Sequence, residues 1–303
     1  MKCLRPFQMR GKEQDVIEVP CRHCIACTIN KIQALKFYAQ CEIATQNLQG
    51  YGSSFIRLSY NNANLPVIYE NKLYRLGELI HDNKVPTNVT PTILRSDFQK
   101  FMKRIRIARD RKKLPGTAFY RSSWKYIYNG EYGDIGGRPH MHLLLFGIGS
   151  NEVQSVFNEY WKFGFIDYKP LKVGAVKYCS EYMFNDVFGK ERIKKYTSKG
   201  VEPPFLYHSK GLGKNFFISH KDFETGFIML NGQKTVIPEY IRQKYNISIP
   251  HYKISNIENY NKTLAYIGRC RQRGIPVDDR SLYAKKNDVD TSKINNLISE
   301  VNL

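Results

Sequence analysis

The chain has 303 residues, of which 42% are hydrophobic and 13% aromatic, a composition typical of soluble globular proteins and not of disordered chains. Lysine and arginine number 47 against 27 acidic residues, so the formal net charge is +20. This excess indicates a polyanionic partner, with nucleic acid the first candidate and an anionic membrane the second. No stretch approaches the ~20 apolar residues that cross a bilayer, and no apolar signal region opens the chain, so we expect a cytoplasmic protein. The absence of a Gly-x-x-x-x-Gly-Lys-Ser/Thr motif excludes a P-loop nucleotide motor.

A group of cysteines lies near the amino end. Cys21, Cys24 and Cys27 follow two Cys-x-x-Cys steps, and Cys3 lies upstream. Thiolates at this spacing, on a turn that runs into a helix, favour a structural zinc ion with four ligands, of which Cys3 is the natural fourth. An iron–sulfur cluster and buried thiols without any metal are the alternatives. The poorer candidates for the fourth ligand are His23 and Cys41.

The first predicted elements are a helix and a strand. Apolar residues recur at helical spacing over 28–48, and residues 55–60 alternate between apolar and polar side chains as in a half-buried strand. The region 67–91 is polar and loop-like. A short hairpin is predicted within it, with its turn at residues 70–71.

A basic helix is predicted over 98–109, with Ser96 and Asp97 as its N-terminal cap. Its apolar residues form one stripe, whereas the region 100–113 carries eight basic residues and one acidic residue. A solvated helix face is the ordinary interpretation, but the density of charge fits a surface that faces phosphates. The residues assigned here to DNA contact are Lys103, Arg104 and Arg106.

Two strands are predicted over 124–132 and 140–146, joined by a turn with two glycines and a proline. Successive side chains point to opposite faces of a strand, so His140 and His142 share one face. If the strands pair, Glu131 reaches that face and completes a three-ligand metal site with open positions. Histidines without a ligand are the alternative, and a register slip of one residue would remove Glu131 from the site.

A helix over 151–161, a strand over 164–168 and a helix over 173–188 are predicted next. Tyr178 and Tyr182 lie four residues apart in the last helix, so they share one helical face. Because tyrosine can attack phosphorus and hold DNA as an aryl phosphodiester, the pair is a candidate for covalent catalysis. Simple packing of two aromatic rings is the common alternative.

A glycine-containing loop precedes a weakly patterned end. Lys210 and Lys214 flank two glycines, so backbone amides and cations there could hold a phosphate, although a loop without a ligand is an equal interpretation. A hairpin is predicted over 226–236. Helical pieces are predicted over 238–245 and from about residue 254.

Seven motif-bearing stretches follow one another along the chain: residues 19–27, 55–66, 97–106, 130–133, 137–147, 178–182 and 209–213. This order resembles the replication initiator proteins of small icosahedral single-stranded DNA phages, in the gokushovirus branch of the microviruses. Those initiators belong to the wider HUH endonuclease family. The resemblance covers residues 1 to about 215, and the joint order is more specific than any single motif.

The resemblance implies an α+β fold of the HUH endonuclease, ferredoxin-like type. A central antiparallel sheet would carry the histidines, with helices flanking it. Three regions are expected: a cysteine knuckle with the first helix packed on the core (1–50), an HUH nicking domain (51–220) and a helical C-terminal extension of unknown role (221–303).

The resemblance also implies a nicking and joining enzyme. Glu131, His140 and His142 match the family's metal ligands, with Mg²⁺ or Mn²⁺ as the expected ion, and Tyr178 and Tyr182 match its paired nucleophiles. A nick in single-stranded origin DNA would leave a 5′-phosphotyrosine and a free 3′-hydroxyl, and a later transfer would close a circle. A host helicase and a DNA polymerase are the expected partners, in the cytoplasm of the host bacterium.

One departure from the family concerns a lysine that commonly follows the second tyrosine. Residues 183–186 contain none, and Lys177 or Lys190 is the candidate substitute, with Lys177 assigned to DNA contact. Two other interpretations stay open. One is a non-catalytic, metal-stabilised DNA-binding protein that uses the cysteines and the basic helix, and the other is a tyrosine transposase or relaxase of the same chemistry.

Overall fold

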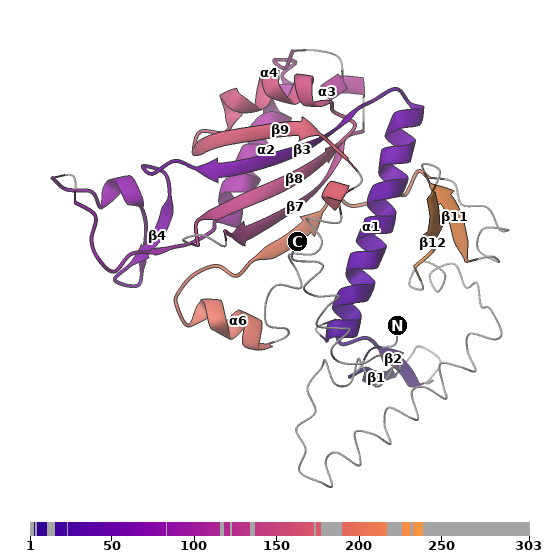
Figure 1. Ribbon diagram of the computed structural model, residues 1–303, viewed down its shortest axis with the longest axis horizontal. Coiled ribbons are helices and arrows are strands. Elements are labelled where there is room, and N and C mark those ends of the chain that lie inside the picture. The colour runs from indigo at the N-terminus through magenta and orange to yellow at the C-terminus, as the bar shows by residue number, and fades with distance from the viewer. Residues whose placement is uncertain are drawn as a thin grey trace, which may run out of the picture. The chain divides into compact units, whose positions relative to one another are not determined.

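The described part of the chain falls into two compact units (Figure 1). The larger unit lies within Tyr38–Met183 and Lys190–Phe216, and the smaller within Met1–Phe37 and Phe217–Leu303. Among the residues described, no helix combines the length and the apolar character that crossing a bilayer requires. The computed structural model describes residues 3, 5–10, 16–22, 24–82, 84–115, 118–121, 123–133, 137–172, 174–176, 190–216, 226–230 and 233–238.

A five-stranded antiparallel sheet is the frame of the larger unit (Figure 1). Its central strand is β8, which pairs with β7 on one side and β3 on the other. The expected central antiparallel sheet in a mixed fold of strands and helices is therefore confirmed, as are the predicted hairpin and the predicted strands on either side of it. In spatial order the strands are β10 (Phe205–His208), β7 (Lys125–Tyr132), β8 (Pro139–Phe146), β3 (Ser53–Tyr60) and β9 (Gly164–Pro170).

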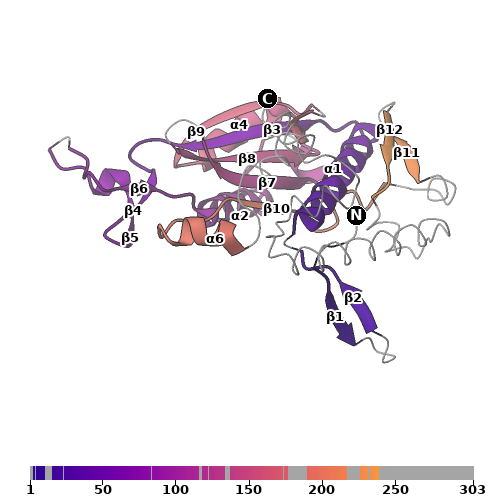
Figure 2. The ribbon, with the colours of Figure 1, turned by 60° about the horizontal axis from the view of Figure 1, so that its bottom comes forward.

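Helices cover one face of this sheet (Figures 1 and 2). Every second residue of β8 points toward them, and Met141, Leu143 and Leu145 are fully buried there. Burial of an apolar side chain of this size contributes roughly 1.5–3 kcal/mol, so these positions bind the sheet firmly to the helices. The covering helices are α2 (Arg95–Asp110) and α4 (Ser150–Tyr160), with the short α3 (Ala118–Arg121) between them in the sequence.

A buried carboxylate joins three segments on the opposite face. Glu42 lies in α1 (Ile25–Leu48), which begins three residues before the predicted start at residue 28. Its side chain is fully buried, and Oε2 lies 2.9 Å from Lys125 Nζ of β7 and accepts the Gly213 amide at 2.8 Å. Lys125 is on the same face of β7 as Glu131 because they are six residues apart on one strand. The second half of α1 therefore lies on the histidine face, near the start of β7.

Short strands form the remaining sheets. The predicted hairpin at residues 70–71 is confirmed, because β4 pairs with β5 and both turn residues have positive φ values of 49° and 61°. The predicted hairpin over 226–236 is confirmed by the pairing of β11 with β12 (Figure 2). These elements and the small ones beside them are β1 (Phe7–Arg10), β2 (Val16–Val19), β4 (Pro66–Tyr69), β5 (Lys72–Arg75), the 3₁₀ turn η1 (Leu76–Glu78), β6 (Thr90–Pro91), β11 (Phe227–Leu230) and β12 (Gln233–Val236).

The sequence analysis missed β1, β2, β6 and β10. Each has four residues or fewer, which is too short for an alternation to stand out. β10 lies in the stretch that was interpreted as a loop, and it forms an edge of the main sheet. The basic tract from residue 190 is a helix, α6 (Lys190–Thr197). The predicted helices over 238–245 and from about 254 lie outside the described residues, and of the helix over 173–188 only residues 174–176 are described, as helical.

The predicted cap of the basic helix is wrong. α2 begins at Arg95, and Leu94 occupies the N-cap position without any side-chain hydrogen bond. The carboxylate of Asp97 is instead fully buried, where it pairs with Arg75 at 2.7 Å and accepts a hydrogen bond from the Tyr60 hydroxyl at 3.0 Å. A tertiary ion pair has thus taken the side chain that sequence alone assigned to local capping.

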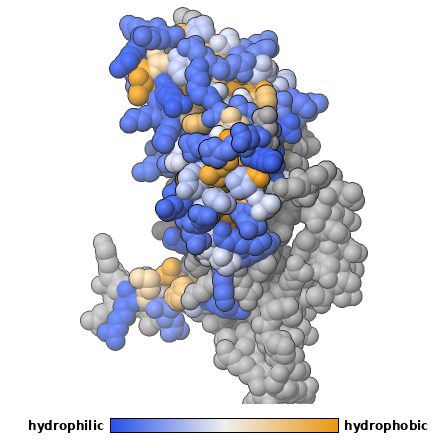
Figure 3. All heavy atoms as spheres, turned by 90° about the vertical axis from the view of Figure 1, so that its left-hand side faces the viewer, coloured by the Kyte–Doolittle hydropathy of each residue, from blue (hydrophilic) through white to orange (hydrophobic). Residues whose placement is uncertain are grey.

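The coloured surface in Figure 3 is mostly hydrophilic, with apolar side chains in small groups. This distribution agrees with a chain whose charged residues make up 24% of the sequence. Exposed apolar side chains scattered in this way are ordinary and need no special role.

Two ion pairs of the same chemistry differ in burial, and this difference predicts their contributions to stability. We expect Arg75→Ala to lower the free energy of unfolding by about 3–5 kcal/mol, because it leaves Asp97 charged and buried without its partner. The matched control is Arg57→Ala, whose partner Asp167 is 53% exposed, and its expected loss is below about 1 kcal/mol. Urea denaturation followed by circular dichroism measures both, and equal losses would contradict the expectation.

Candidate metal centre

Glu131, His140 and His142 meet on the face of the sheet opposite α2. The two histidines lie on the central strand β8, and the register places Glu131 of β7 directly opposite His140. The pairing that the hairpin prediction required is therefore present, without a slip. Gly130 helps to hold it, because a side chain at this position would overlap Ile93 and Phe205 on the other face.

The ligand atoms of the three side chains converge. Oε1 of Glu131 lies 2.7 Å from Nε2 of His140 and 2.8 Å from Nε2 of His142. The two imidazole rings are perpendicular, with centroids 4.9 Å apart. Glu131 and His142 are buried and His140 is partly exposed, so the site opens to solvent on the side of His140.

The protonation states suit a cation. Burial alone would raise the pKa of Glu131, but the hydrogen bonds with His140 and His142 outweigh it, and the pKa lies below its usual value. Burial lowers the pKa of His142 below its usual value, although Glu131 acts in the opposite direction. An ionised carboxylate and a neutral imidazole, the forms present at neutral pH, are those that bind metal ions.

The donor set fits Mg²⁺ or Mn²⁺. Octahedral ligands about 2.1 Å from such an ion lie about 3 Å from each other, close to the separations of the three ligand atoms here. A carboxylate with two imidazoles also leaves coordination positions for water and substrate. Nδ1 of His140 lies 3.2 Å from the Arg138 carbonyl oxygen, so a proton on Nδ1 leaves Nε2 to face the ion.

Asn129 supports the carboxylate and was missed by the sequence analysis. Its side-chain amide donates to Oε2 of Glu131 at 3.1 Å, which turns the other oxygen, Oε1, toward the histidines. Asn129 is buried and lies opposite His142 in the register. The signal that could have found it is the alternation of β7, since residues 129 and 131 share a face.

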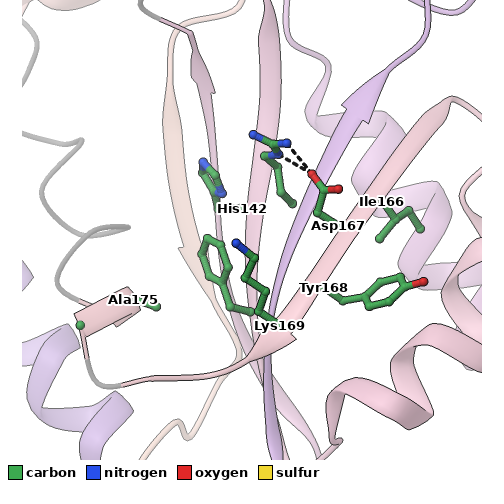
Figure 4. Close-up of a pocket in the computed structure, with 9 residues that line it drawn as sticks. His142, Ile166, Asp167, Tyr168, Lys169 and Ala175 are labelled. Atoms are coloured by element: carbon green, nitrogen blue, oxygen red, sulfur yellow. Dashed lines mark hydrogen bonds and ion pairs between the residues drawn. The ribbon is translucent and has the colours of Figure 1, made fainter.

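A pocket adjoins the site (Figure 4). Its volume is about 730 Å³, and His142 contributes to its lining as well as to the ligand group. The ring of Phe55 stacks on His142 with centroids 5.3 Å apart. Residues 174 and 175 also line the pocket, and Tyr178 follows three residues later in the sequence.

The four cysteines form a second group, in the smaller unit. The Sγ atoms of Cys3 and Cys24 are 3.9 Å apart, and those of Cys21 and Cys27 are 4.0 Å apart. Four sulfurs bound tetrahedrally at about 2.3 Å lie about 3.8 Å from each other, so the spacing fits one zinc ion. Backbone amides of Cys21 and Cys24 donate to the sulfurs of Cys3 and Cys21, at 3.1 and 3.3 Å. All four ligand atoms lie within 4.8 Å of one another.

The residues assigned to DNA contact do not gather in one place. Lys103, Arg104 and Arg106 are exposed on α2, which packs on the face of the sheet opposite the histidines. Arg104 lies over the ring of Phe163, and Arg106 donates to the Tyr126 hydroxyl at 3.0 Å. Lys210 and Lys214 are exposed in the loop after β10, which Glu42 holds through Gly213. The assigned residues outside the described part of the chain are Lys177, Tyr178 and Tyr182.

Comparison with known proteins confirms the resemblance to viral replication proteins. Residues 83–187 match the family model for the replication-associated protein ORF2. The chain is 23% identical to the Replication-associated protein ORF2 of Spiroplasma virus 4, over 88% of this chain and 76% of the relative. It is 23% identical to the Replication-associated protein VP4 of Bdellovibrio phage phiMH2K, over 82% and 79%, and 24% identical to the Replication-associated protein ORF4 of Chlamydia phage 1, over 80% and 57%. No solved structure matches the chain.

The hydrogen bond from Asn129 predicts a measurable effect on metal affinity. We expect Mn²⁺ to raise the melting temperature of the chain after EDTA treatment, because the ion binds the folded site. Asn129→Ala should weaken Mn²⁺ binding about 10- to 100-fold, and Glu131→Ala should remove it. Isothermal titration calorimetry measures the affinity, with Asn64→Ala, a change to another partly buried asparagine, as the control. Wild-type affinity in Asn129→Ala would show that the hydrogen bond does not position the carboxylate.

Proposed function

We propose that this protein initiates rolling-circle replication of a phage genome by nicking single-stranded origin DNA and later rejoining it. The observation that carries the proposal is the convergence of Glu131, His140 and His142 on the central strand of an antiparallel sheet. The similar proteins are named for a role in replication, and the formal charge of +20 suits a nucleic acid partner. The fold in this proposal is of the HUH endonuclease type, with the nicking domain over 51–220.

The metal ligands orient the reaction. A divalent ion held by Glu131, His140 and His142 would polarise the scissile phosphate and stabilise the charge that develops on its oxygens. Asn129 keeps the carboxylate turned toward the histidines. The open side at His140 admits the phosphate, and the buried side at Glu131 and His142 keeps the ligand set fixed.

The nucleophile in this proposal is Tyr178 or Tyr182. The phenol loses its proton to solvent, its oxygen bonds to phosphorus, and the bond from phosphorus to the 3′ oxygen breaks. The 3′ oxygen leaves as a hydroxyl, after taking a proton from solvent, and primes synthesis. After one round of copying the second tyrosine cuts the regenerated origin, and the new 3′-hydroxyl attacks the first phosphotyrosine to close a circle. Strand separation and synthesis come from a host helicase and polymerase in the bacterial cytoplasm.

Zinc at the four cysteines has a structural role in this proposal. The ion would tie Cys3, at the start of the chain, to the turn that leads into α1. Burial raises the pKa of Cys3 to about 11, so without a cation this thiol stays protonated at neutral pH. Amide donors to two of the sulfurs stabilise the thiolate form that the ion requires.

Covalent adducts with DNA test the nicking function. Incubation of the full chain with Mn²⁺ and single-stranded oligonucleotides from its own origin should give a protein band shifted by the attached DNA. We expect Tyr178→Phe and Tyr182→Phe each to keep one route to the adduct, and the double variant to lose it. An adduct formed by the double variant would mean that neither tyrosine is the nucleophile.

The histidines provide the matching test of metal dependence. Changing both His140 and His142 to alanine should abolish cleavage while much of the DNA binding stays, because the binding depends on the positive charge of the whole chain. Cleavage by this variant at the wild-type rate would show that the metal site is not used. DNA binding without cleavage by the wild type would favour the non-catalytic DNA-binding alternative.

The cysteine group predicts a zinc content of one ion per chain, measured by elemental analysis of the purified protein. Replacement with Co²⁺ should give the absorption bands of a tetrahedral thiolate site. Cys24→Ser should lower both the zinc content and the melting temperature. The control is Cys41→Ser, since Cys41 is similarly buried and lies outside the group. Equal zinc content in Cys24→Ser and wild type would contradict the site.

A further inference from the structure

The histidine face of the sheet continues from β8 across β3 to the edge strand β9. On β3, Ser59 lies opposite both His140 of β8 and Phe165 of β9. Side chains alternate along a strand, so Phe165 and, two residues later, Asp167 share the face of the histidines. Adjacent strands lie about 4.8 Å apart, so β9 runs about 10 Å from the strand that carries the metal ligands.

The pocket beside the metal centre lies over these strands (Figure 4). Its lining includes Arg57 and Phe55 of β3 and Lys169 of β9, together with His142. The volume of about 730 Å³ falls in the range of roughly 300–1,000 Å³ in which proteins bind ligands the size of a nucleotide. Because His142 belongs to both groups, an occupant of the pocket lies next to the metal centre.

The charged groups of the pocket favour an anion. Arg57 pairs with Asp167, with Nε 2.8 Å from Oδ2, but both side chains are about half exposed, at 54% and 53%. An exposed pair of this kind adds little stability, so the guanidinium can share its donors with a phosphate. Lys169 supplies a second, exposed cation, which gives these three groups a net positive charge.

An exposed aromatic ring completes the surface. Phe165 is 66% exposed, whereas the aromatic residues of the opposite face form the core. A flat ring open to solvent at the edge of a basic surface provides a platform on which an unpaired base can stack. A base inside a duplex has both of its faces covered by neighbours, so this ring selects single strands.

We propose that Arg57, Phe165 and Lys169, here called the β3–β9 surface, bind nucleotides of single-stranded DNA beside the scissile phosphate. Arg57 and Lys169 contact phosphates, and Phe165 stacks on a base. The position of this surface next to the scissile bond rests on the nicking function proposed above, whereas its affinity for single-stranded DNA does not. The two can therefore be tested separately.

Equilibrium binding in EDTA tests the β3–β9 surface without any cleavage. The probe is a fluorescein-labelled single-stranded oligothymidylate, and its anisotropy is followed at several salt concentrations with the full chain. Phe165→Ala should weaken binding roughly 5- to 150-fold without changing the salt dependence. Changing both Arg57 and Lys169 to glutamine should weaken binding and reduce the slope of log K against log salt by about 0.7 for each phosphate that the variant no longer neutralises.

Matched controls come from the exposed strand β5. Leu73→Ala removes an exposed apolar side chain, and Lys72→Gln removes an exposed cation, both away from the sheet face described above. Their effects on binding should be much smaller. Asp167→Asn is the informative opposite: it removes a negative charge and releases Arg57, so it should tighten binding, a gain that a merely structural role would not produce.

The outcomes separate this inference from the proposed function. Wild-type affinity in Phe165→Ala and in the Arg57 and Lys169 double variant would overturn the β3–β9 surface, even if the wild type forms covalent adducts. An equal loss of affinity for blunt duplex DNA would overturn the preference for single strands. Weaker binding of the oligothymidylate by these variants would support the surface, even if the wild type forms no adduct and the nicking function fails.

Discussion

The register between β7 and β8 is the constraint on which the candidate site depends. A slip of one residue would turn Glu131 and Asn129 to the helix side of the sheet and leave the histidines without a carboxylate. Burial of Met141, Leu143 and Leu145 opposes that slip, because it would expose these side chains on the other face. Gly130 opposes it as well, since only a residue without a side chain fits between Ile93 and Phe205. Core packing on one face thus fixes the chemistry of the other.

The same ladder of strands grades the environment across the sheet. At its centre, Glu131 and His142 are buried and hold their partners within 3 Å. Toward the β9 edge, Arg57 and Asp167 are about half in solvent. A fixed ion site needs the first environment, because ligand geometry decides metal affinity. A surface that takes up and releases a polyanion needs the second, where ion pairs exchange at little cost.

The sequence predicted the parts of this protein in which periodicity is long or the chemistry is local. The helices over 28–48 and 98–109, the central hairpin and the facing of His140 with His142 follow from spacing alone. The cap at Asp97 failed because a distant arginine, Arg75, competes for the same carboxylate, and no local pattern reports such a partner. Four short strands escaped for lack of length. Asn129 escaped because its role depends on which side chain stands beside it, and the tyrosine pair lies outside the described residues.

The central position of β8 has a consequence for motion. Among the described strands, β8 is hydrogen-bonded on both sides, whereas β9 pairs only with β3. Backbone hydrogen bonds at a sheet edge open more readily than those at its centre, so amide exchange should be slowest around the histidines and faster along β9. The ligands of the ion therefore sit on the most rigid strand, while the edge can shift to follow a moving DNA strand. One sheet can thus combine a rigid reaction centre with an adaptable approach to it.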